Sequence, residues 1–194
     1  MSELPDGWAL GKVKEIGNVV TGSTPSKQHA EYYDGEIPFF KPTDLNASYN
    51  VRKSSDTLTE EGAERGRLVP AGSVMVTCIG ATIGKTGLAR VQGVTNQQIN
   101  TVVPSKGILS EFLYDYFVSS AGQTDIVQNA SATTLPILNK GRFSDLEIPI
   151  APLNEQRRIV AKLEKCEARV GAARAALDEV PKRLEQYRQS VLAA

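Results

Sequence analysis

Three consecutive side-chain amides, Asn96, Gln97 and Gln98, precede a strand-like run at residues 99–103. An amide can both donate to and accept from the edge of one adenine in the major groove of DNA, so amide clusters suit the reading of base sequence. The alternative is a polar turn ahead of a strand, with no part in binding. The run is therefore a candidate DNA-reading segment.

Basic and hydroxyl side chains in predicted loops supply further candidate contacts to DNA. Loop lysines and arginines suit phosphate contacts, although any one of them is more often a solvated surface charge. Threonine hydroxyls suit base contacts, and they cap turns equally well. The basic candidates are Lys27, Lys41, Arg65, Arg67, Lys85, Lys140 and Arg142, and the hydroxyl candidates are Thr43, Thr133 and Thr134.

Catalytic and metal-binding constellations do not assemble from this sequence. The stretch from Gly80 to Thr86 has the composition of a phosphate loop, but three residues separate its glycines where that motif requires four. His29 is the only histidine, and Cys78 and Cys166 are distant in the sequence, so neither a zinc site nor a Ser-His-Asp arrangement is expected. We expect a chain with no metal, cofactor or catalysis of its own.

The bulk composition indicates one core-forming domain with an extension. The 194 residues are 41% hydrophobic, and no apolar run approaches the roughly 20 residues of a membrane helix. The first residues lack a secretory pattern and two cysteines suggest no disulfide framework, so we expect a cytoplasmic protein without membrane contact. Basic and acidic residues balance at 22 each, so any basic surface must be local or completed by a partner.

Residues 1–150 predict an α+β domain, a globular unit of mixed short strands and helices. Gly, Ser, Thr and Pro crowd residues 22–35 and 80–87, which we expect to be loops. Thr59 is expected to cap a helical turn, and Ser110 to cap a helix with one apolar face. Strands are expected at residues 8–10, 37–40, 73–79, 88–91, 99–103, 135–138 and 146–150.

A long helix with the apolar stripe of a coiled coil is predicted for residues 151–194. Its apolar positions alternate in steps of four and three residues, a 3.5-residue repeat that keeps one stripe facing a partner helix. The alternative, packing on its own domain, usually needs a wider apolar face. The expected dimerisation stripe comprises Ile159, Leu163, Cys166, Val170, Ala173, Leu177, Val180, Leu184, Tyr187 and Val191.

Capping, proline and charge shape this helix further. Asn154 is expected to cap its start. Pro181 removes one backbone hydrogen bond and should bend the helix near that residue without ending it. Residues 155–194 hold nine Lys and Arg against six Asp and Glu, so the helix is basic and the remainder of the chain is acidic.

The chain resembles the specificity subunits of type I restriction–modification enzymes along essentially its whole length. The helix opening, Pro152-Leu153-Asn154-Glu155-Gln156, is similar to the spacer of that family. Residues 4–8 (LPDGW), 22–26 (GSTPS), 80–85 (GATIGK) and 96–99 (NQQI) are similar to parts of its target recognition domains. Full-length members have two recognition domains and two spacers, whereas this sequence has one of each, which implies a half-length form.

The resemblance implies a role shared with other subunits. Residues 1–150 would be a target recognition domain for double-stranded DNA, and residues 151–194 a spacer that docks a methyltransferase subunit and a second copy of the chain. Adenine methylation by that partner with S-adenosylmethionine, and cleavage by a restriction subunit, are implied, with neither step on this chain. A homodimer with antiparallel helices would bind an inverted, gapped site.

A function of another class stays open on the sequence alone. Zero net charge favours a coiled-coil scaffold or inhibitor that occupies a partner protein without binding DNA. A basic patch formed by Lys27, Lys41 and Lys85 would argue against that alternative.

Overall fold

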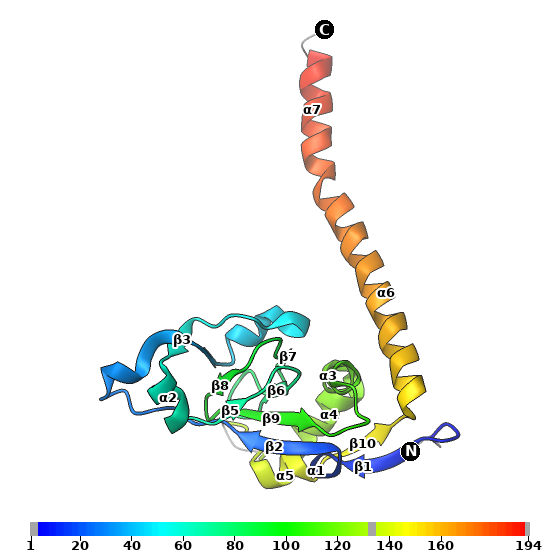
Figure 1. The fold of residues 1–194 in the computed structure, drawn as a ribbon. Helices are drawn as coiled ribbons and strands as arrows, with labels where there is room; N and C mark the ends of the chain where they lie inside the picture. The colour runs from blue at the N-terminus through cyan, green and yellow to red at the C-terminus, as the bar shows by residue number, and fades with distance from the viewer. Residues whose placement is uncertain (1–3, 132–134, 193–194) are drawn as a thin grey trace. The chain divides into compact units, whose positions relative to one another are not determined.

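The computed structural model describes residues 4–131 and 135–192, apart from the side chains of Ala47 and Val191. The chain separates into two compact units, Met1–Gln156 and Arg157–Ala194 (Figure 1). The first combines short strands with short helices and the second is helical, which confirms the predicted α+β class with a long C-terminal helix. The assignment of separate roles to residues 1–150 and 151–194 stays a prediction.

The main sheet of the first unit is antiparallel. Its strands, in spatial order, are β2 (Gly17–Thr21), β9 (Ile99–Pro104), β6 (Val74–Thr77) and β7 (Thr86–Leu88). Every residue of β6 and β7 is buried, and the β-branched valines and threonines of these strands fit such a pleated, enclosed surface.

A second four-stranded sheet lies in the same unit. Its strands, in spatial order, are β4 (Asp56–Leu58), β3 (Tyr33–Phe40), β8 (Gly93–Thr95) and β5 (Leu68–Val69). β3 and β8 run parallel, so both strands end at the same edge of the sheet. A separate antiparallel pair, β1 (Ala9–Lys12) with β10 (Glu147–Ile150), joins the start of the unit to its end.

Short helices connect the strands. They are α1 (Val13–Ile16), η1 (Ala30–Tyr32), η2 (Asp44–Asn50), α2 (Glu60–Arg65), α3 (Ser110–Val118), α4 (Ser120–Asn129) and α5 (Lys140–Ser144). Thr59 caps α2 as predicted, because its hydroxyl accepts a hydrogen bond from the Gly62 amide at 3.2 Å. The prediction that Ser110 caps α3 is wrong: Leu109 holds the cap position, and Ser110 is the first helical residue.

The hydrophobic core packs the main sheet against α3, α4 and α5. Val76 of β6 belongs to one buried cluster with Phe117 of α3, Ile126 of α4 and Phe143 of α5. The rings of Phe117 and Phe143 stack with centroids 5.6 Å apart. Cys78 lies in the same cluster, where burial raises the pKa of its thiol to about 12, so this cysteine is an inert thiol.

Some strand predictions differ from the structure. The strand expected at residues 88–91 is instead β7, Thr86–Leu88: the Gly84 amide bonds to the Thr77 carbonyl at 2.9 Å, which closes the turn and lets pairing with β6 begin already at Thr86. Residues 135–138 form no strand, only a single bridge between Ile79 and Ile137. β5 and β8 were not predicted, since strands of two and three residues are too short for an alternating pattern.

The second unit is built from the helix α6 (Leu153–Asp178), which begins in the first unit, and from α7 (Val180–Leu192). The helices separate at Glu179, close to Pro181, and meet at a bend (Figure 1), as predicted from the proline. Residues 161–190 are exposed along their whole length. None of the helices within the described residues is long and apolar enough to cross a membrane.

The start of α6 corrects one sequence prediction. Asn154 is not the cap, because the helix begins one residue earlier, at Leu153. The Pro152 carbonyl instead accepts the first hydrogen bonds, from the amides of Glu155 at 2.8 Å and Gln156 at 2.9 Å.

Candidate nucleic-acid interface

Loops that follow four strands gather at one edge of the first unit. The strand register places the ends of β2 and β6 beside the start of β9. The second sheet ends at the same place, because the Ser23 amide, just after β2, donates to the carbonyl of Thr95 at the end of β8, at 2.9 Å. β2 points toward this edge in Figure 1. We name these loops, residues 22–24, 41–44, 78–85 and 96–98, the loop edge.

The predicted amide run divides into a buried and an exposed part. Asn96 is buried: its Nδ2 donates to Gln98 Oε1 at 3.0 Å, and its Oδ1 accepts from the Gln98 amide at 3.1 Å. Gln98 is half-buried and reaches the Ile79 carbonyl at 3.5 Å. Gln97 is exposed and accepts a hydrogen bond from the Thr24 hydroxyl. Asn96 therefore shapes the turn, while Gln97 and Thr24 present polar groups to solvent.

Two hydroxyls at the base of the loop edge lack partners. Ser23 Oγ and Thr95 Oγ1 are buried, and neither has a hydrogen bond to any other described residue. The Ser23 amide donates to the Thr95 carbonyl at 2.9 Å, so the two residues are adjacent. Buried polar groups in native folds are nearly always satisfied by protein, water or ligand. Unused hydrogen-bonding capacity therefore lies next to the exposed Thr24 and Gln97.

Lys41 and Thr43 lie at the end of β3, and Lys41 is already engaged there. Its ammonium forms an ion pair with Asp56 and lies 5.6 Å from the centroid of the Phe39 ring. Its backbone amide donates to Asp44 Oδ2 at 2.8 Å, so Asp44 caps this turn. Thr43 is exposed and its hydroxyl makes no capping bond. Thr43 is thus the more available of the two for a ligand.

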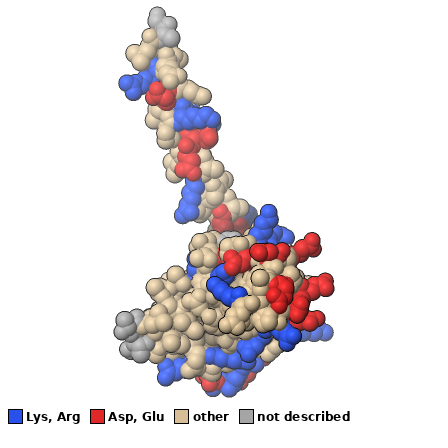
Figure 2. Space-filling view, turned by 90° about the vertical axis from the view of Figure 1, so that its left-hand side faces the viewer, with Lys and Arg blue, Asp and Glu red and all other residues tan. Residues whose placement is uncertain are grey.

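The remaining basic candidates near this edge differ in exposure. Lys85 is half-buried in the β6–β7 turn, and Lys27 is exposed ahead of η1. Arg67 is exposed, and its Nη1 donates to the Thr21 carbonyl at 2.6 Å, which brings it to the end of β2. Figure 2 shows this side of the unit, where basic side chains form separate groups beside a cluster of acidic ones. Since Lys41 is paired with Asp56, Lys27, Lys41 and Lys85 do not form a patch of unpaired positive charge.

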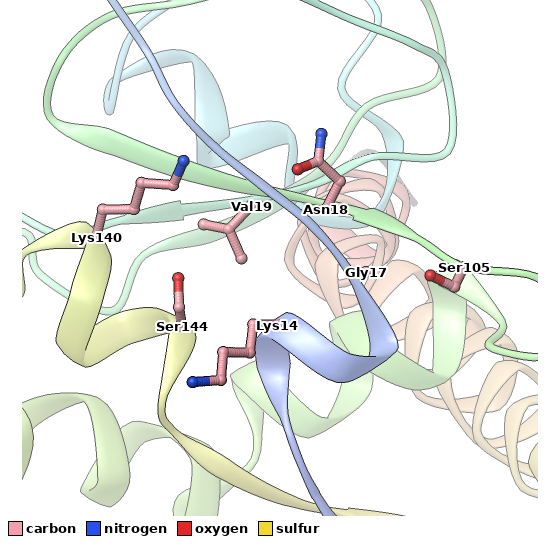
Figure 3. Close-up of a pocket in the computed structure, with 7 residues that line it drawn as sticks. All are labelled: Lys14, Gly17, Asn18, Val19, Ser105, Lys140 and Ser144. Atoms are coloured by element: carbon pink, nitrogen blue, oxygen red, sulfur yellow. The ribbon is translucent and has the colours of Figure 1, made fainter.

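A second polar site lies at the opposite end of β2 (Figure 3), and we name it the basic pocket. Its volume is about 450 Å³, and it is lined by Lys14, Gly17, Asn18, Val19, Ser105, Lys140 and Ser144. Figure 3 shows the ammonium groups of Lys14 and Lys140 on either side of the Ser144 hydroxyl. Lys140 is a predicted site residue, and Lys14, which lines the same pocket, is one that sequence reasoning missed.

An acidic neighbour tunes the charge of this pocket. Lys14 Nζ lies 2.8 Å from Asp145 Oδ1, and Lys12 Nζ lies 3.6 Å from the same oxygen. The hydrogen bond and charge of Asp145 raise the pKa of Lys14, and those of Lys14 lower the pKa of Asp145. Two lysines therefore share one carboxylate, and the further lysine that lines the pocket, Lys140, gives it a positive balance suited to an anion.

Arg142 and the two threonines complete the predicted set. Asn139 caps α5 by accepting from the Arg142 amide at 2.9 Å. The Arg142 side chain is exposed, and its Nη1 lies 3.5 Å from the Asn129 carbonyl. Thr133 and Thr134 fall outside the described residues.

The site has the composition of a binding surface. Its exposed groups are amide, hydroxyl and ammonium, and among the described residues no group of three His, Cys, Asp or Glu is placed to hold a metal ion. A polar loop edge on a double sheet, with an exposed apolar helix stripe in the same chain, is typical of a recognition module whose stripe is open to a partner.

The chain belongs to the family described as type I restriction modification DNA specificity domain, which matches residues 5–181. The specificity subunit of type I restriction enzyme MjaIX from Methanocaldococcus jannaschii is 31% identical over 168 residues, or 84% of this chain and 38% of that protein. The HindI specificity subunit from Haemophilus influenzae is 33% identical over 170 residues, covering 84% and 37%. The chain therefore spans less than half the length of these relatives.

Solved structures share the fold. A structure described as showing complex assembly and conformational transition of the type I R-M system superposes with a TM-score of 0.77 at 22% identity, over 98% of this chain and 46% of the other. The HsdS subunit from Thermoanaerobacter tengcongensis gives a TM-score of 0.71 at 22% identity, over 90% and 41%.

Proposed function

We propose that this chain is a DNA sequence-recognition subunit of a type I restriction–modification enzyme. The observation that carries the proposal is the family match over residues 5–181, joined to a loop edge whose exposed groups suit base reading. The chain would be non-catalytic and cytoplasmic. A methyltransferase subunit would supply S-adenosylmethionine chemistry, and a restriction subunit would supply cleavage.

Two parts of the first unit would share the contact with DNA. Gln97, Thr24 and Thr43 on the loop edge would read bases, with Arg67, Lys27 and Lys85 beside them on phosphates. The basic pocket would bind a further phosphate through Lys140. β2 connects the two sites, and its four residue steps span about 13 Å. That span corresponds to about four phosphates of one strand along the duplex axis, so one duplex could engage both sites.

Co-expression with the methyltransferase subunit from the same source, followed by mapping of methylated adenines, tests the function. Methylation at one gapped motif with two-fold symmetry is expected, because a homodimer presents the same recognition unit twice. An asymmetric motif would contradict the homodimer. Absence of methylation, although both subunits are soluble and co-purify, would favour the scaffold or inhibitor alternative.

That alternative has one structural observation in its favour. Lys41, a predicted phosphate contact, is neutralised by Asp56, and the face in Figure 2 carries acidic groups as well as basic ones. A scaffold would give no sequence-dependent protection of DNA, whereas a recognition subunit with its methyltransferase would protect its motif alone.

Lys140→Ala is expected to weaken DNA binding and to reduce its dependence on salt. Loss of one phosphate contact lowers the slope of log affinity against log salt by about 0.9. The measurement is DNA affinity across a salt series for the complex with the methyltransferase subunit. Lys182→Ala, an exposed lysine on α7, is the control. An unaltered slope for Lys140→Ala would remove the basic pocket from the interface.

The proposed occupant of the exposed helix stripe is a second, antiparallel copy of the chain. A shallow groove on α6 is lined by Leu163, Cys166, Glu167, Val170, Gly171 and Arg174. Ala173 lies on the stripe and Ala176 beside it, and both side chains are small. Two backbones can approach closely here, so the dimer axis would pass between residues 171 and 172.

Charge favours this direction and register. The antiparallel pair places Glu167 of each copy beside Arg174 of the other. If one helix slid along the other by one heptad, two like charges would meet. Glu167 of one copy would lie beside Glu167 of the other, or Arg174 beside Arg174, according to the direction of the shift. A parallel pair would instead place Arg169 beside Arg174 of the second copy. One like-charged contact remains in the antiparallel pair, between Lys162 and Arg183, away from the axis.

Charge reversal at Glu167 tests the register. Glu167→Arg should weaken the dimer about tenfold, because two exposed attractive pairs worth up to ~1 kcal/mol each become repulsive. The double variant Glu167→Arg/Arg174→Glu should restore the native dissociation constant in analytical ultracentrifugation. Glu185→Arg, on the solvent side of α7, is the control.

Cys166 offers an independent check of direction. In the antiparallel pair the two Cys166 thiols lie 11 residues apart along the axis, about 16 Å. A disulfide needs Cα atoms within about 7 Å, so mild oxidation should not crosslink the dimer. A rapidly formed Cys166 crosslink would contradict the antiparallel arrangement.

A further inference from the structure

A second groove lies on the first unit, between α2 and the edge of the second sheet. Its volume is about 400 Å³, and its lining is mainly apolar: Ile37, Ala63, Gly66 and Leu68, with Glu60 and Glu64. Leu68 is 50% exposed, although it belongs to β5. β5 is an edge strand that pairs only with β8, so this side of the sheet is open. We name the site the acidic groove.

Two carboxylates form its rim without a described counter-charge. Glu60 and Glu64 lie one turn apart on α2, and both are exposed. Neither takes part in the ion pairs found among the described residues. Like charges four residues apart on a helix repel each other, so a cation bound beside this pair would relieve that repulsion. The groove thus combines an apolar floor with a rim complementary to positive charge.

The groove lies close to the loop edge. Arg67, between the groove residues Gly66 and Leu68, donates to the Thr21 carbonyl at 2.6 Å, and β2 leads directly into the loop edge. DNA itself does not suit the groove, because carboxylates repel phosphates. A protein docked in the groove would stand next to the bases that the loop edge is proposed to read.

We propose that the acidic groove docks a cationic, amphipathic segment of the methyltransferase subunit. This inference rests on the proposed function. An enzyme that methylates an adenine within the recognised sequence must be held beside the loop edge and must itself approach phosphates, which favours a basic surface at that place. Leu68 and Ile37 would receive an apolar side chain of the segment, and Glu60 and Glu64 would pair with its flanking lysines or arginines.

Charge reversal of the rim is the test, measured as the affinity of the full chain for the methyltransferase subunit. Glu60→Lys/Glu64→Lys is expected to weaken binding about tenfold or more, and the loss of affinity should be larger at low salt than at high salt. Asp6→Lys/Glu147→Lys is the matched control, because it changes the net charge equally at exposed positions outside the groove. Leu68→Ser should weaken binding without a change in charge, and thermal unfolding shows that each variant is folded.

The outcomes separate the two proposals. Weaker binding for the rim variant and for Leu68→Ser, with the control unaffected, supports the groove. Native affinity for both variants, while the native chain still binds the methyltransferase, overturns the groove and leaves the proposed function standing. A native chain that does not bind the methyltransferase at all overturns both.

Discussion

Gln156→Leu is expected to lower the free energy of unfolding of the first unit by about 3 kcal/mol. Gln156 is 1% exposed, and its amide satisfies three backbone groups. Oε1 accepts from the Leu109 amide at 2.9 Å, while Nε2 donates to the carbonyls of Ala151 at 2.8 Å and Gly107 at 3.1 Å. Leucine has a similar volume, so the cost comes from buried groups left unpaired, at ~1–3 kcal/mol each before relaxation.

Urea unfolding followed by circular dichroism and by Trp8 fluorescence measures this change. Gln189→Leu is the matched control, since Gln189 is exposed on α7 and should alter stability by no more than about 0.5 kcal/mol. Gln156→Glu keeps the acceptor for the Leu109 amide but loses the donors to the two carbonyls. Its loss of unfolding free energy should be comparable or larger, because a charge is also buried. A loss below about 1 kcal/mol for Gln156→Leu would show that water replaces the amide.

Local sequence patterns predicted the parts of this fold that local forces decide. The apolar stripe and Pro181 predicted a long helix with a bend, because helix periodicity and a missing amide act within a few residues. Thr59 predicted the start of α2 for the same reason. The strand at residues 99–103 was predicted from its β-branched run, and β9 confirms it.

Contacts between segments far apart in the sequence determine the features that local sequence patterns did not predict. Asn96 and Gln97 are adjacent amides, yet one is buried and the other exposed, because β3 and β8 draw the Asn96 backbone into the sheet end. Lys14 and Lys140 are far apart in the chain and line one pocket only because α1 and α5 both lie beside β2. Nothing in the spacing of either lysine signals that pocket. The DNA contacts proposed for these residues stay predictions.

Leu177→Glu and Val170→Glu are each expected to abolish pairing of the C-terminal helix. Both residues occupy the same heptad position one repeat apart, and both are exposed in the single chain, Leu177 by 68% and Val170 by 52%. Their exposure means that the variants should fold normally as monomers. In the dimer, each glutamate would be buried in an apolar seam without a partner, at a cost of several kcal/mol, and two-fold symmetry applies that cost twice.

Light scattering on the purified chain separates the outcomes, because one chain has a mass of 21.0 kDa and the proposed dimer has twice that mass. Ala175→Glu is the matched control: it introduces the same charge two residues from Leu177, on the face turned away from the seam, and should leave the dimer intact. If Leu177→Glu and Val170→Glu both remain dimeric, the interface lies on another face of the helix. If the native chain is monomeric at high concentration, the stripe binds a helix of another protein and not a second copy. The prediction of a two-fold symmetric DNA motif would then lose its physical basis.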